Sequence, residues 1–510
     1  MSPSFKLVWN SLLRRSRIGL SFLFALSGLT CSLSAQSILF DYTYGYADYS
    51  FGKSIVQMAD SGYVFLANTG NPNGNARLLL VRLDQFGIPQ FYKEFHDYDL
   101  YNGNFLIKAA NGDLLITGEV KNDNTPYQPF VMRVDSLFNV KWTFVLPCND
   151  WSFSRQLLEL PNREIVMVGE TYDTDTTSVD ALWVKLSETG QSLSVIKSEL
   201  PGDDGFTSVS LWSDSLMLVS GFQQNLITND SVPFYSLMNF NGENHHHVQY
   251  GAIRNKAVST QAFRDPFGKV VTIGYTRMYD DLEYKDFYLI LFDSAGNSLY
   301  SSYVDYPIWQ HADDEYSSMG IAANGDLIVG VNAEGNSYYK PTIILHLYRG
   351  GDYAFKRSVV RSGTGYQKSD ILSQVIPTND GGFILIGTTT SLGTHLSDIL
   401  ICKLDSNLTP ITPTSHYLPV EEYCESPAYS LFPNPATSKI SLFVDQKQNE
   451  YVQISLYNTQ SILLWSGQHN FFMQPQIDFD LTRYPPGLYF LKIHGKGYQL
   501  HLKISKVNAR

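Results

Sequence analysis

Short clusters of acidic residues are the side chains of this sequence with the clearest capacity for chemistry. Carboxylate oxygens can coordinate Ca²⁺, accept hydrogen bonds from sugar hydroxyls or pair with a basic protein surface. Acidic residues also collect on long loops because water solvates them there, so the sequence leaves a binding role and a solvating role open. The candidate binding residues are Asp173, Asp175, Asp203, Asp204, Asp280, Asp281, Asp313 and Asp314.

Two segments invite a metal-binding interpretation but fit it poorly. Asp173-Thr-Asp175 has the spacing that opens a helical calcium loop, but the glycine and the twelfth-position glutamate of that loop are missing. In the run from His245 to His247, only the first and third side chains share a face of a strand, and no carboxylate or cysteine at metal spacing accompanies them. We predict no metal site and no cofactor, with calcium as the weaker alternative.

Linear catalytic motifs are absent. The sequence contains no Gly-x-Ser-x-Gly elbow, His-Glu-x-x-His helix, phosphate-binding loop or Cys-x-x-Cys pair. We therefore predict no catalytic residues and a non-catalytic binding or adhesion module that meets a glycan or protein ligand. Paired carboxylates for polysaccharide cleavage leave no linear trace when they come from separate repeats, so an extracellular hydrolase or lyase is the alternative. A structural component of a surface machine is the second alternative.

The acidic loops belong to a sequence repeat. Its best copy runs from Asn379 to Asp405: a glycine-rich turn, an apolar strand closed by a glycine, a loop, and a second strand closed by an aspartate. Intervals of 51 to 57 residues separate successive copies, and a turn of the type Asp84-Gln-Phe-Gly87 keeps the same period, degenerating in the sixth and seventh copies. The residues that close the apolar strand are Ala67, Gly118, Gly169, Gly221, Gly274, Gly330 and Gly387.

Four short strands in about fifty residues are typical of one blade of a β-propeller. We predict an all-β chain whose residues 36–415 form a seven-bladed β-propeller. Pro410 and Pro413 weaken the last copy's fourth strand, so we expect Ile38–Tyr44 to complete that blade. Loops between blades, and between second and third strands, would then emerge on one face and bring the acidic residues together.

These repeats loosely resemble the propeller repeats of many exported bacterial surface proteins, in which an Asp-x-x-Gly turn precedes a strand that carries an aromatic residue. Phe91, Trp142 and Tyr300 hold that aromatic position. The signatures of kelch, PQQ-type and sialidase-type propellers are not matched.

Residues 1–35 have the layout of an export signal. A basic head precedes the apolar run Ile18–Leu29, and small residues follow at Ser32–Ala35. The run is too short for a permanent membrane anchor, so we predict a mature protein without a transmembrane helix. The basic residues are Lys6, Arg14, Arg15 and Arg17.

Composition and charge narrow the possible partners. Hydrophobic residues make up 44% of the chain and aromatic residues 14%, which indicates a globular protein. Removal of the signal changes the formal net charge from −12 to −16, and this acidity argues against nucleic acid as a partner. Cys148, Cys402 and Cys424 then remain, too sparse a set for a disulfide framework.

A proline-rich linker over 416–428 precedes a second domain. Residues 429–510 contain several short alternating strands, which predict a small β-sandwich. This segment opens with Pro433-Asn434-Pro435-Ala436, continues to the strand Gly487–Ile493, and ends on a basic strand.

The tail closely resembles the type A C-terminal sorting domain of the type IX secretion system, apart from Asn508-Ala-Arg510, which extends beyond the usual lysine-rich end. The resemblance implies the type IX secretion machinery as a partner, passage through the periplasm and the outer membrane, and delivery to the cell surface or the medium. It also implies a tail that is recognised and usually removed. The residues that carry the motif are Pro433, Asn434, Pro435, Gly487, Tyr489, Lys503 and Lys506.

Overall fold

The computed structural model divides the chain into two compact units, 1–416 and 417–510, and its described part consists of strands and loops without a helix. The predicted signal at 1–35 lies outside the described residues. The structure describes residues 38–508 except 71–75, 123–124, 173–177, 199–201, 229, 251–256, 277–285, 305–312, 335–341, 350–353, 362–368, 391–394, 410–413, 418–428, 445–450, 459–462, 472–473, 475 and 496–497.

Groups of four consecutive strands follow the sequence repeats in the first unit. The strands are β1 (Phe40–Gly45), β2 (Tyr49–Gln57), β3 (Tyr63–Gly70), β4 (Ala76–Leu83), β5 (Pro89–Phe95), β6 (Leu100–Lys108), β7 (Leu114–Lys121), β8 (Gln128–Val134), β9 (Val140–Val145), β10 (Trp151–Glu159), β11 (Ile165–Tyr172), β12 (Val179–Leu186), β13 (Ser192–Lys197), β14 (Asp204–Leu211), β15 (Leu216–Gln224), β16 (Ser231–Asn239), β17 (Asn244–Gln249), β18 (Val258–Arg264), β19 (Val270–Thr276), β20 (Asp286–Phe292), β21 (Ser298–Val304), β22 (Asp313–Ile321), β23 (Leu327–Glu334), β24 (Thr342–Arg349), β25 (Ala354–Arg361), β26 (Asp370–Pro377), β27 (Phe383–Thr389), β28 (Asp398–Leu404) and β29 (Thr414–Tyr417).

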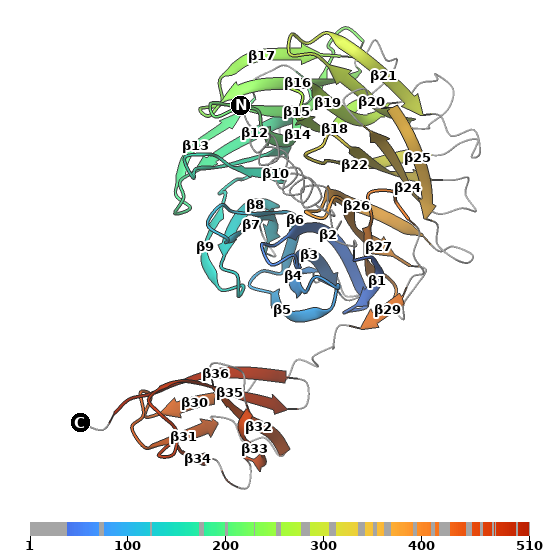
Figure 1. Ribbon diagram of the computed structural model, residues 1–510. Coiled ribbons are helices and arrows are strands. Elements are labelled where there is room, and N and C mark those ends of the chain that lie inside the picture. Colours follow the sequence, from blue (N-terminus) through green and yellow to red (C-terminus); the bar gives the residue numbers. More distant parts are fainter. Residues whose placement is uncertain are drawn as a thin grey trace, which may run out of the picture. The chain divides into compact units, whose positions relative to one another are not determined.

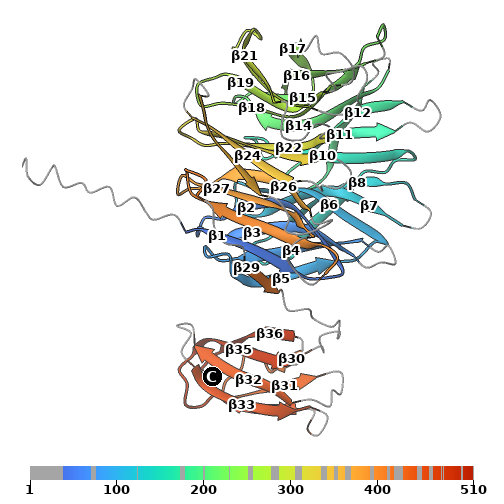
Figure 2. The same ribbon diagram turned by 90° about the vertical axis from the view of Figure 1, so that its right-hand side faces the viewer.

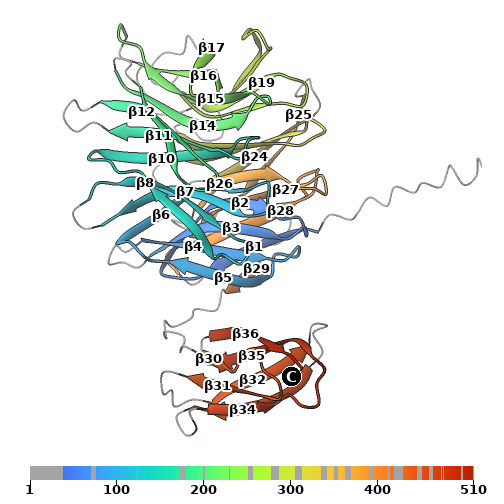
Figure 3. The same cartoon turned by 90° about the vertical axis from the view of Figure 1, so that its left-hand side faces the viewer.

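Antiparallel meanders form the sheets of this unit. The orders β10–β13, β14–β17, β18–β21 and β22–β25 each follow the chain, and a parallel contact between Ala76 and Leu100 joins β2–β5 to β6–β9. The sheets succeed one another around a common centre, with the blue β2 beside the orange β26 and β27 (Figure 1). The first strand of each group lies nearest that centre, and we call it the inner strand. Figures 2 and 3 show the same stack of sheets from its two sides.

The first strand of the described chain belongs to the last sheet. β1 pairs antiparallel with β28, in a register that sets Phe40 opposite Lys403 and Tyr44 opposite Ile399. The sheet order is β26-β27-β28-β1-β29, so the segment after the last repeat adds a strand outside β1. The predicted pairing of Ile38–Tyr44 with the seventh repeat is confirmed.

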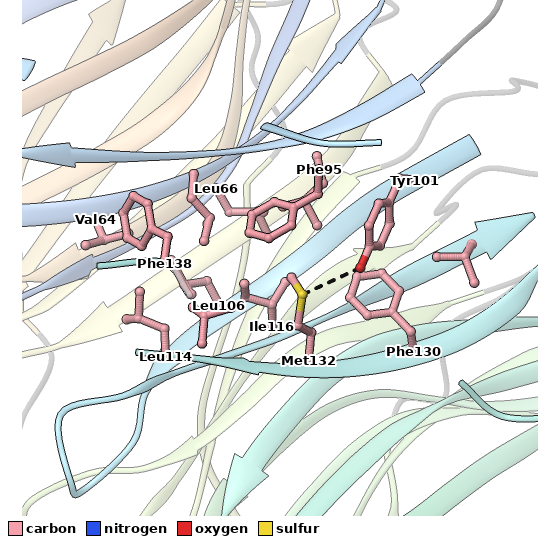
Figure 4. Close-up of a cluster of buried hydrophobic side chains, with 14 of the residues drawn as sticks. Val64, Leu66, Phe95, Tyr101, Leu106, Leu114, Ile116, Phe130, Met132 and Phe138 are labelled. Carbon is pink, nitrogen blue, oxygen red and sulfur yellow. Dashed lines mark hydrogen bonds between the residues drawn. The ribbon is translucent and has the colours of Figure 1, made fainter. Parts of the chain in front are cut away.

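Apolar side chains fill the spaces between consecutive sheets. One cluster combines Leu66 and Leu80 of the first repeat with Leu106, Ile116 and Met132 of the second, all at most 1% exposed (Figure 4). The second strand of a repeat therefore buries both faces, as its continuous apolar sequence requires. Each such side chain contributes about 1.5–3 kcal/mol when it leaves water.

The repeated glycine has a steric cause. A Cβ atom at Gly118 would lie 1.9 Å from the carbonyl oxygen of Asn102, and one at Gly169 would lie 2.0 Å from that of Phe153. Both oxygens belong to the inner strand of the same repeat, next to a β-bulge that shifts its register. Only glycine lets the second strand approach the inner strand this closely.

The Asp-x-x-Gly turns are built by side-chain hydrogen bonds. Asp84 Oδ1 accepts the backbone N–H groups of Phe86 and Ile88, each at 2.9 Å, and Gly87 has a φ of 80°. In the seventh copy Asp405 makes the equivalent bonds to Asn407 and Thr409 at 2.9 Å. The sequence of the turn degenerates in this copy, as expected, but the turn itself is kept, because Leu408 takes the glycine position with a φ of 54°.

These turns pack on the fourth strand of the preceding repeat, and two of them meet aromatic rings there. The Trp142 ring lies 2.6 Å from the position of a Cβ atom at Gly190, and its Nε1 donates to the Glu188 carbonyl at 3.1 Å. Rings of Phe40 and Tyr42 in β1 each lie 2.9 Å from the position of a Cβ atom at Gly87, whose carbonyl accepts the Tyr44 hydroxyl at 2.7 Å. The aromatic position of the repeat therefore joins neighbouring sheets.

Hydrogen bonds also link successive inner strands. A serine or glutamine beside the bulge of one inner strand accepts the backbone N–H of a residue in the next, at 2.7–3.1 Å. The last of these bonds returns from the seventh repeat to the first. The acceptor and donor residues are Ser54 with Leu106, Gln156 with Val209, Ser208 with Ala262, Gln261 with Met319, Ser318 with Val375, and Gln374 with Ile55.

The second unit contains two sheets that share one core. The sheet orders are β30-β31-β34 and β33-β32-β35-β36, and buried residues from both, among them Ile440 and Leu491, form a single cluster. The strands are β30 (Tyr429–Phe432), β31 (Lys439–Val444), β32 (Tyr451–Asn458), β33 (Leu463–Asn470), β34 (Gln476–Asp480), β35 (Gly487–Gly495) and β36 (Tyr498–Lys506).

Candidate functional site

The predicted acidic residues divide into three groups. Asp173, Asp175, Asp280 and Asp281 lie outside the described residues. Asp313 and Asp314 begin β22, where they pair with Glu334 and Ala333 of β23. Asp203 and Asp204 lie together where the chain enters β14, so the structure places these two at one sheet edge.

Asp203 holds the entry to β14 in place. Its carboxylate accepts the backbone N–H of Val179 in the preceding repeat at 3.0 Å, and its own N–H donates to Gln224 Oε1 at 3.1 Å. These bonds join β14 to β12 and to β15. These hydrogen bonds account for an aspartate at position 203, and no bound ligand is needed to explain it.

Asp204 is buried, with 3% of its surface exposed. Burial raises the pKa of its carboxyl to about 6, and the hydrogen bond from Ser198 opposes that rise. The negative charges of Asp180 and Asp203 raise the pKa further. Asp204 therefore exchanges a proton closer to neutrality than an ordinary aspartate does.

An aromatic cluster lies where the second and third repeats meet. Trp151, the first residue of β10, is 50% exposed, and its ring lies 6.1 Å from Tyr127 and 6.4 Å from Tyr172. Tyr127 also lies 5.6 Å from Phe153, and Lys121 Nζ sits 5.2 Å from its ring centre. We call Tyr127, Trp151, Phe153 and Tyr172 the aromatic cluster. It presents a ring-sized apolar surface next to a cation.

Charged side chains adjoin this cluster through the strand register. Phe153 lies opposite Glu170 in the β10–β11 pair, and Trp151 lies opposite Tyr172. Arg155, with a half-exposed side chain, forms an ion pair with Glu170. Glu170 Oε2 also lies 3.0 Å from the position of a Cβ atom at Gly205, which directly follows Asp204.

Glu119 occupies the same repeat position as Glu170, directly after the close-approach glycine. It is buried, and its Oε1 accepts the Ser154 N–H at 2.9 Å and Asn104 Nδ2 at 2.7 Å. Burial raises the pKa of Glu119 to about 7, although the hydrogen bonds from Ser154 and the charges of Arg155 and Lys53 lower it. Burial disfavours the charged form of Lys53 as well, and it therefore lowers the pKa of that ammonium group.

This arrangement favours recognition of a hydroxylated ring. Aromatic faces stack on the apolar faces of such a ring, and a guanidinium and carboxylates at their margin can bind its hydroxyl groups. Sequence reasoning did not select Trp151, Arg155, Glu119 or Glu170. The repeated Gly-Glu pairs at 118–119 and 169–170 were the available signal, but they gain meaning only when the register brings them beside the aromatic residues.

The histidine run is part of strand β17. His247 Nδ1 lies 2.8 Å from the Ser236 hydroxyl, and burial together with His246 lowers the pKa of His247. The His246 ring lies 6.4 Å from Tyr235. Across the described part of the chain, no group of three or more histidine, cysteine, aspartate or glutamate side chains is arranged to hold a metal ion.

The predicted motif residues of the tail converge on its last strand. Asn434 Nδ2 donates to the Lys503 carbonyl at 2.7 Å, and its Oδ1 accepts the Ser505 N–H at 2.9 Å. Pro433 and Pro435 flank this asparagine, and Ala436 continues the contact by donating to the Ser505 carbonyl at 2.8 Å.

Two more motif side chains are turned inward. The buried Lys506 ammonium donates to the carbonyl groups of Leu481 and Tyr484, and the Tyr489 hydroxyl donates to the Pro485 carbonyl at 2.5 Å. Gly487 opens β35, opposite Lys506. Lys503 alone among the basic motif residues has an exposed side chain.

Comparison with known families identifies the second unit. Residues 430–506 match the model of the secretion system C-terminal sorting domain. This segment is therefore a sorting domain of the type IX secretion system, as the sequence predicted. The protein is accordingly secreted or held at the cell surface, and it reaches that place through the periplasm and the outer membrane.

Solved structures resemble the chain at low sequence identity. The β-propeller domain of the Trilobed protease from Pyrococcus furiosus is 9% identical, with a TM-score of 0.41, covering 71% of this chain and 93% of that one. The α-L-arabinofuranosidase Arb93A from Fusarium graminearum is 9% identical, with a TM-score of 0.40, covering 59% and 91%. The α-L-arabinanase from Penicillium chrysogenum is 13% identical, with a TM-score of 0.40, covering 59% and 92%.

No curated protein sequence matches the chain. A search of the described residues for a helix long and apolar enough to cross a membrane finds none.

Proposed function

We propose that this protein is a secreted or surface-displayed glycan-binding module built on a seven-bladed β-propeller at residues 36–415. A linker over 416–428 connects the propeller to a β-sandwich at 429–510, which carries the sorting signal. Three features support the propeller: the four-strand groups around one centre, the pairing of β1 with β28, and the return bond from Gln374 to Ile55.

The half-exposed Trp151 within the aromatic cluster is the observation that carries the proposal. A tryptophan in water costs free energy unless a partner covers it, so an exposed one among other rings indicates a contact surface. The adjoining Arg155–Glu170 pair supplies donors and acceptors for sugar hydroxyl groups. The acidic net charge of the chain repels polyanions, which leaves neutral glycans as the best match.

The same residues favour binding over catalysis. Glu119 is buried and already accepts two hydrogen bonds through one oxygen, and Glu170 is paired with Arg155. One observation favours the alternative of a polysaccharide-acting hydrolase or lyase: burial raises the pKa of Glu119 to about 7, a value suited to a general acid or base.

A glycan array combined with a turnover assay on the secreted chain, with and without Ca²⁺, tests the proposal. We expect retention of neutral glycans, no released sugar, and loss of retention in Trp151→Ala. Phe86→Ala is the matched control, since Phe86 is equally exposed but lies in the turn after β4. Retention unaffected by Trp151→Ala would contradict the proposed site. Released sugar, abolished by Glu119→Gln, would establish the enzyme instead.

A further inference from the structure

The two sheets of the sorting domain differ in the faces they turn away from the shared core. On β31 and β34 the outward residues are mostly polar: Lys439 lies opposite Asp480, and Ser441 lies opposite Asp478. Such a face is compatible with water. The other sheet departs from this pattern.

On the second sheet, apolar side chains occupy outward positions. Along β35, Tyr489 and Leu491 point into the core, whereas Leu488 and Phe490 remain 39% and 38% exposed. Phe490 lies opposite Tyr457 of β32, which in turn lies opposite the 53% exposed Leu463 of β33. A strand that only faced water would carry polar residues at these positions.

Basic residues border this apolar row. Lys503 of β36 lies directly opposite Phe490 and is exposed, and Lys492 follows Phe490 two positions along the same face. Residues 429–510 contain eight basic and four acidic side chains, although the whole chain is acidic. A partner that covers this row must therefore combine apolar contacts with a negatively charged rim.

Two motif side chains, the exposed Asn434 and the buried Lys506, are already engaged within the domain. Asn434 and Lys506 bond to backbone groups within the domain. These hydrogen bonds give both side chains a role in maintaining the shape of the domain, so they do not identify the surface that a receptor contacts. A sorting domain needs a surface that the secretion system can contact, and the outward row lies within the matched residues 430–506.

We propose that the outward face of the β33-β32-β35-β36 sheet, centred on Phe490 and Leu488 and bordered by Lys503, is the surface by which a component of the secretion system with an acidic, apolar-centred face recognises this domain. The inference is independent of any glycan bound by the first unit.

Export of the full chain from a host with a type IX secretion system tests this surface. Phe490→Ser combined with Leu488→Ser should lower the secreted fraction at least tenfold, with the protein retained in the periplasm. Phe443→Ser is the matched control, because Phe443 is an outward, half-buried phenylalanine on the other sheet, opposite Gln476. Secretion of the double variant within twofold of the wild type would overturn the proposal, as would an equal loss in the control.

Two further measurements distinguish a loss of recognition from a loss of folding, and distinguish the secretion system from other proteins that could cover this surface. Lys503→Glu leaves the core untouched, so reduced secretion supports recognition, and unchanged secretion overturns it. A photoreactive phenylalanine analogue at position 490 of the full chain should crosslink to a protein of the secretion system, identified by mass spectrometry. A crosslink confined to the chain's own first unit, or to a second copy of the chain, would overturn the proposal.

Discussion

Gln374 Oε1 accepts hydrogen bonds from the backbone N–H of Ile55 at 2.8 Å and from the Ser54 hydroxyl at 2.9 Å, although these residues lie 319 and 320 positions away in the sequence. The bond joins the inner strand of the seventh repeat to that of the first. It is therefore one of several contacts that hold the two ends of the repeat array together, along with the pairing of β1 with β28 and the bond from the Ser373 hydroxyl to the Gly52 carbonyl.

Replacing the Gln374 acceptor should weaken the contact between the first and seventh repeats and lower the stability of the first unit. In Gln374→Leu the buried Ile55 N–H loses its partner, and we expect the free energy of unfolding to fall by about 1–3 kcal/mol. Gln261→Leu removes the equivalent acceptor of Met319 and should cost a similar amount. Urea denaturation measures both, and a Gln374 variant as stable as the wild type would show that this acceptor contributes nothing to stability.

A pair of glycine substitutions isolates the contact between turns and neighbouring repeats. Gly112 and Gly190 have φ values of 88° and 81°, but only at Gly190 would a Cβ atom meet a ring, that of Trp142. We expect Gly112→Ala to cost about 1 kcal/mol through the backbone alone. Gly190→Ala should cost about 1–3 kcal/mol more, because Trp142 must move. Equal losses in thermal unfolding would argue against this packing role.

Trp151 should matter for ligand affinity and little for stability. Because its side chain is half exposed, Trp151→Ala leaves no buried cavity, while removal of a central aromatic contact typically costs about 2 kcal/mol of binding free energy. We expect the dissociation constant for the retained glycan to rise about thirtyfold by calorimetry. A melting temperature lowered as much as the affinity would instead indicate a structural role.

Glu119 should make stability depend on pH. Burial raises its pKa from 4.5 to about 7, so the folded chain keeps a proton that the unfolded chain releases between those values. Its stabilising contribution is complete below pH 4.5 and is lost as the pH rises through 7, a change of about 3 kcal/mol.

Glu119→Gln removes this titration and keeps an acceptor for the Ser154 N–H. Urea denaturation between pH 4.5 and 8 should therefore give a flatter curve for this variant than for the wild type. Glu188→Gln, a change at an exposed glutamate, should leave the wild-type curve unaltered. Parallel curves for the wild type and Glu119→Gln would show that Glu119 does not carry the effect.

Asn434 should hold the last strand of the sorting domain. Asn434→Ala removes both bonds to β36 and should lower the stability of the second unit by about 1–3 kcal/mol. Hydrogen exchange at the Ser505 amide should accelerate, because its acceptor is gone. Lys503→Ala leaves the Lys503 backbone carbonyl in place and should not change that rate. An unaltered exchange rate at Ser505 in Asn434→Ala would show that Asn434 does not hold β36 in place.

Local sequence patterns were sufficient for much of the fold. Close approach of backbones requires glycine at positions such as Gly118 and Gly169, so the repeat was visible as a glycine at a constant interval. The incomplete strand near Phe40 and the prolines after Leu408 were enough to predict the pairing of β1 with β28. The sorting domain was recognisable because its motif residues stand in short local runs, such as Pro433–Ala436 and Gly487–Ile493, although the fold brings together runs that are far apart in the sequence.

The candidate site could not be predicted in the same way. Tyr127 and Trp151 belong to different repeats, and their contact depends on how two sheets pack. Glu119 and Glu170 hold the same position in their repeats, directly after the close-approach glycine. Glu119 accepts the Ser154 N–H, whereas Glu170 forms an ion pair with Arg155, and the repeat pattern does not predict this difference. The acidic pairs drew attention through composition, and Asp203 proves to bond to neighbouring strands.

The pairing of β1 with β28 sets an order of events during synthesis and export. During synthesis, β1 stays without its partner until β28 has been made, after nearly the whole repeat array. The sorting domain is made later than β28. A chain that ends early lacks both the strand that completes its first unit and the signal for release. Because the sorting domain follows β28 in the sequence, a chain that stops before β28 also lacks the signal for passage across the outer membrane.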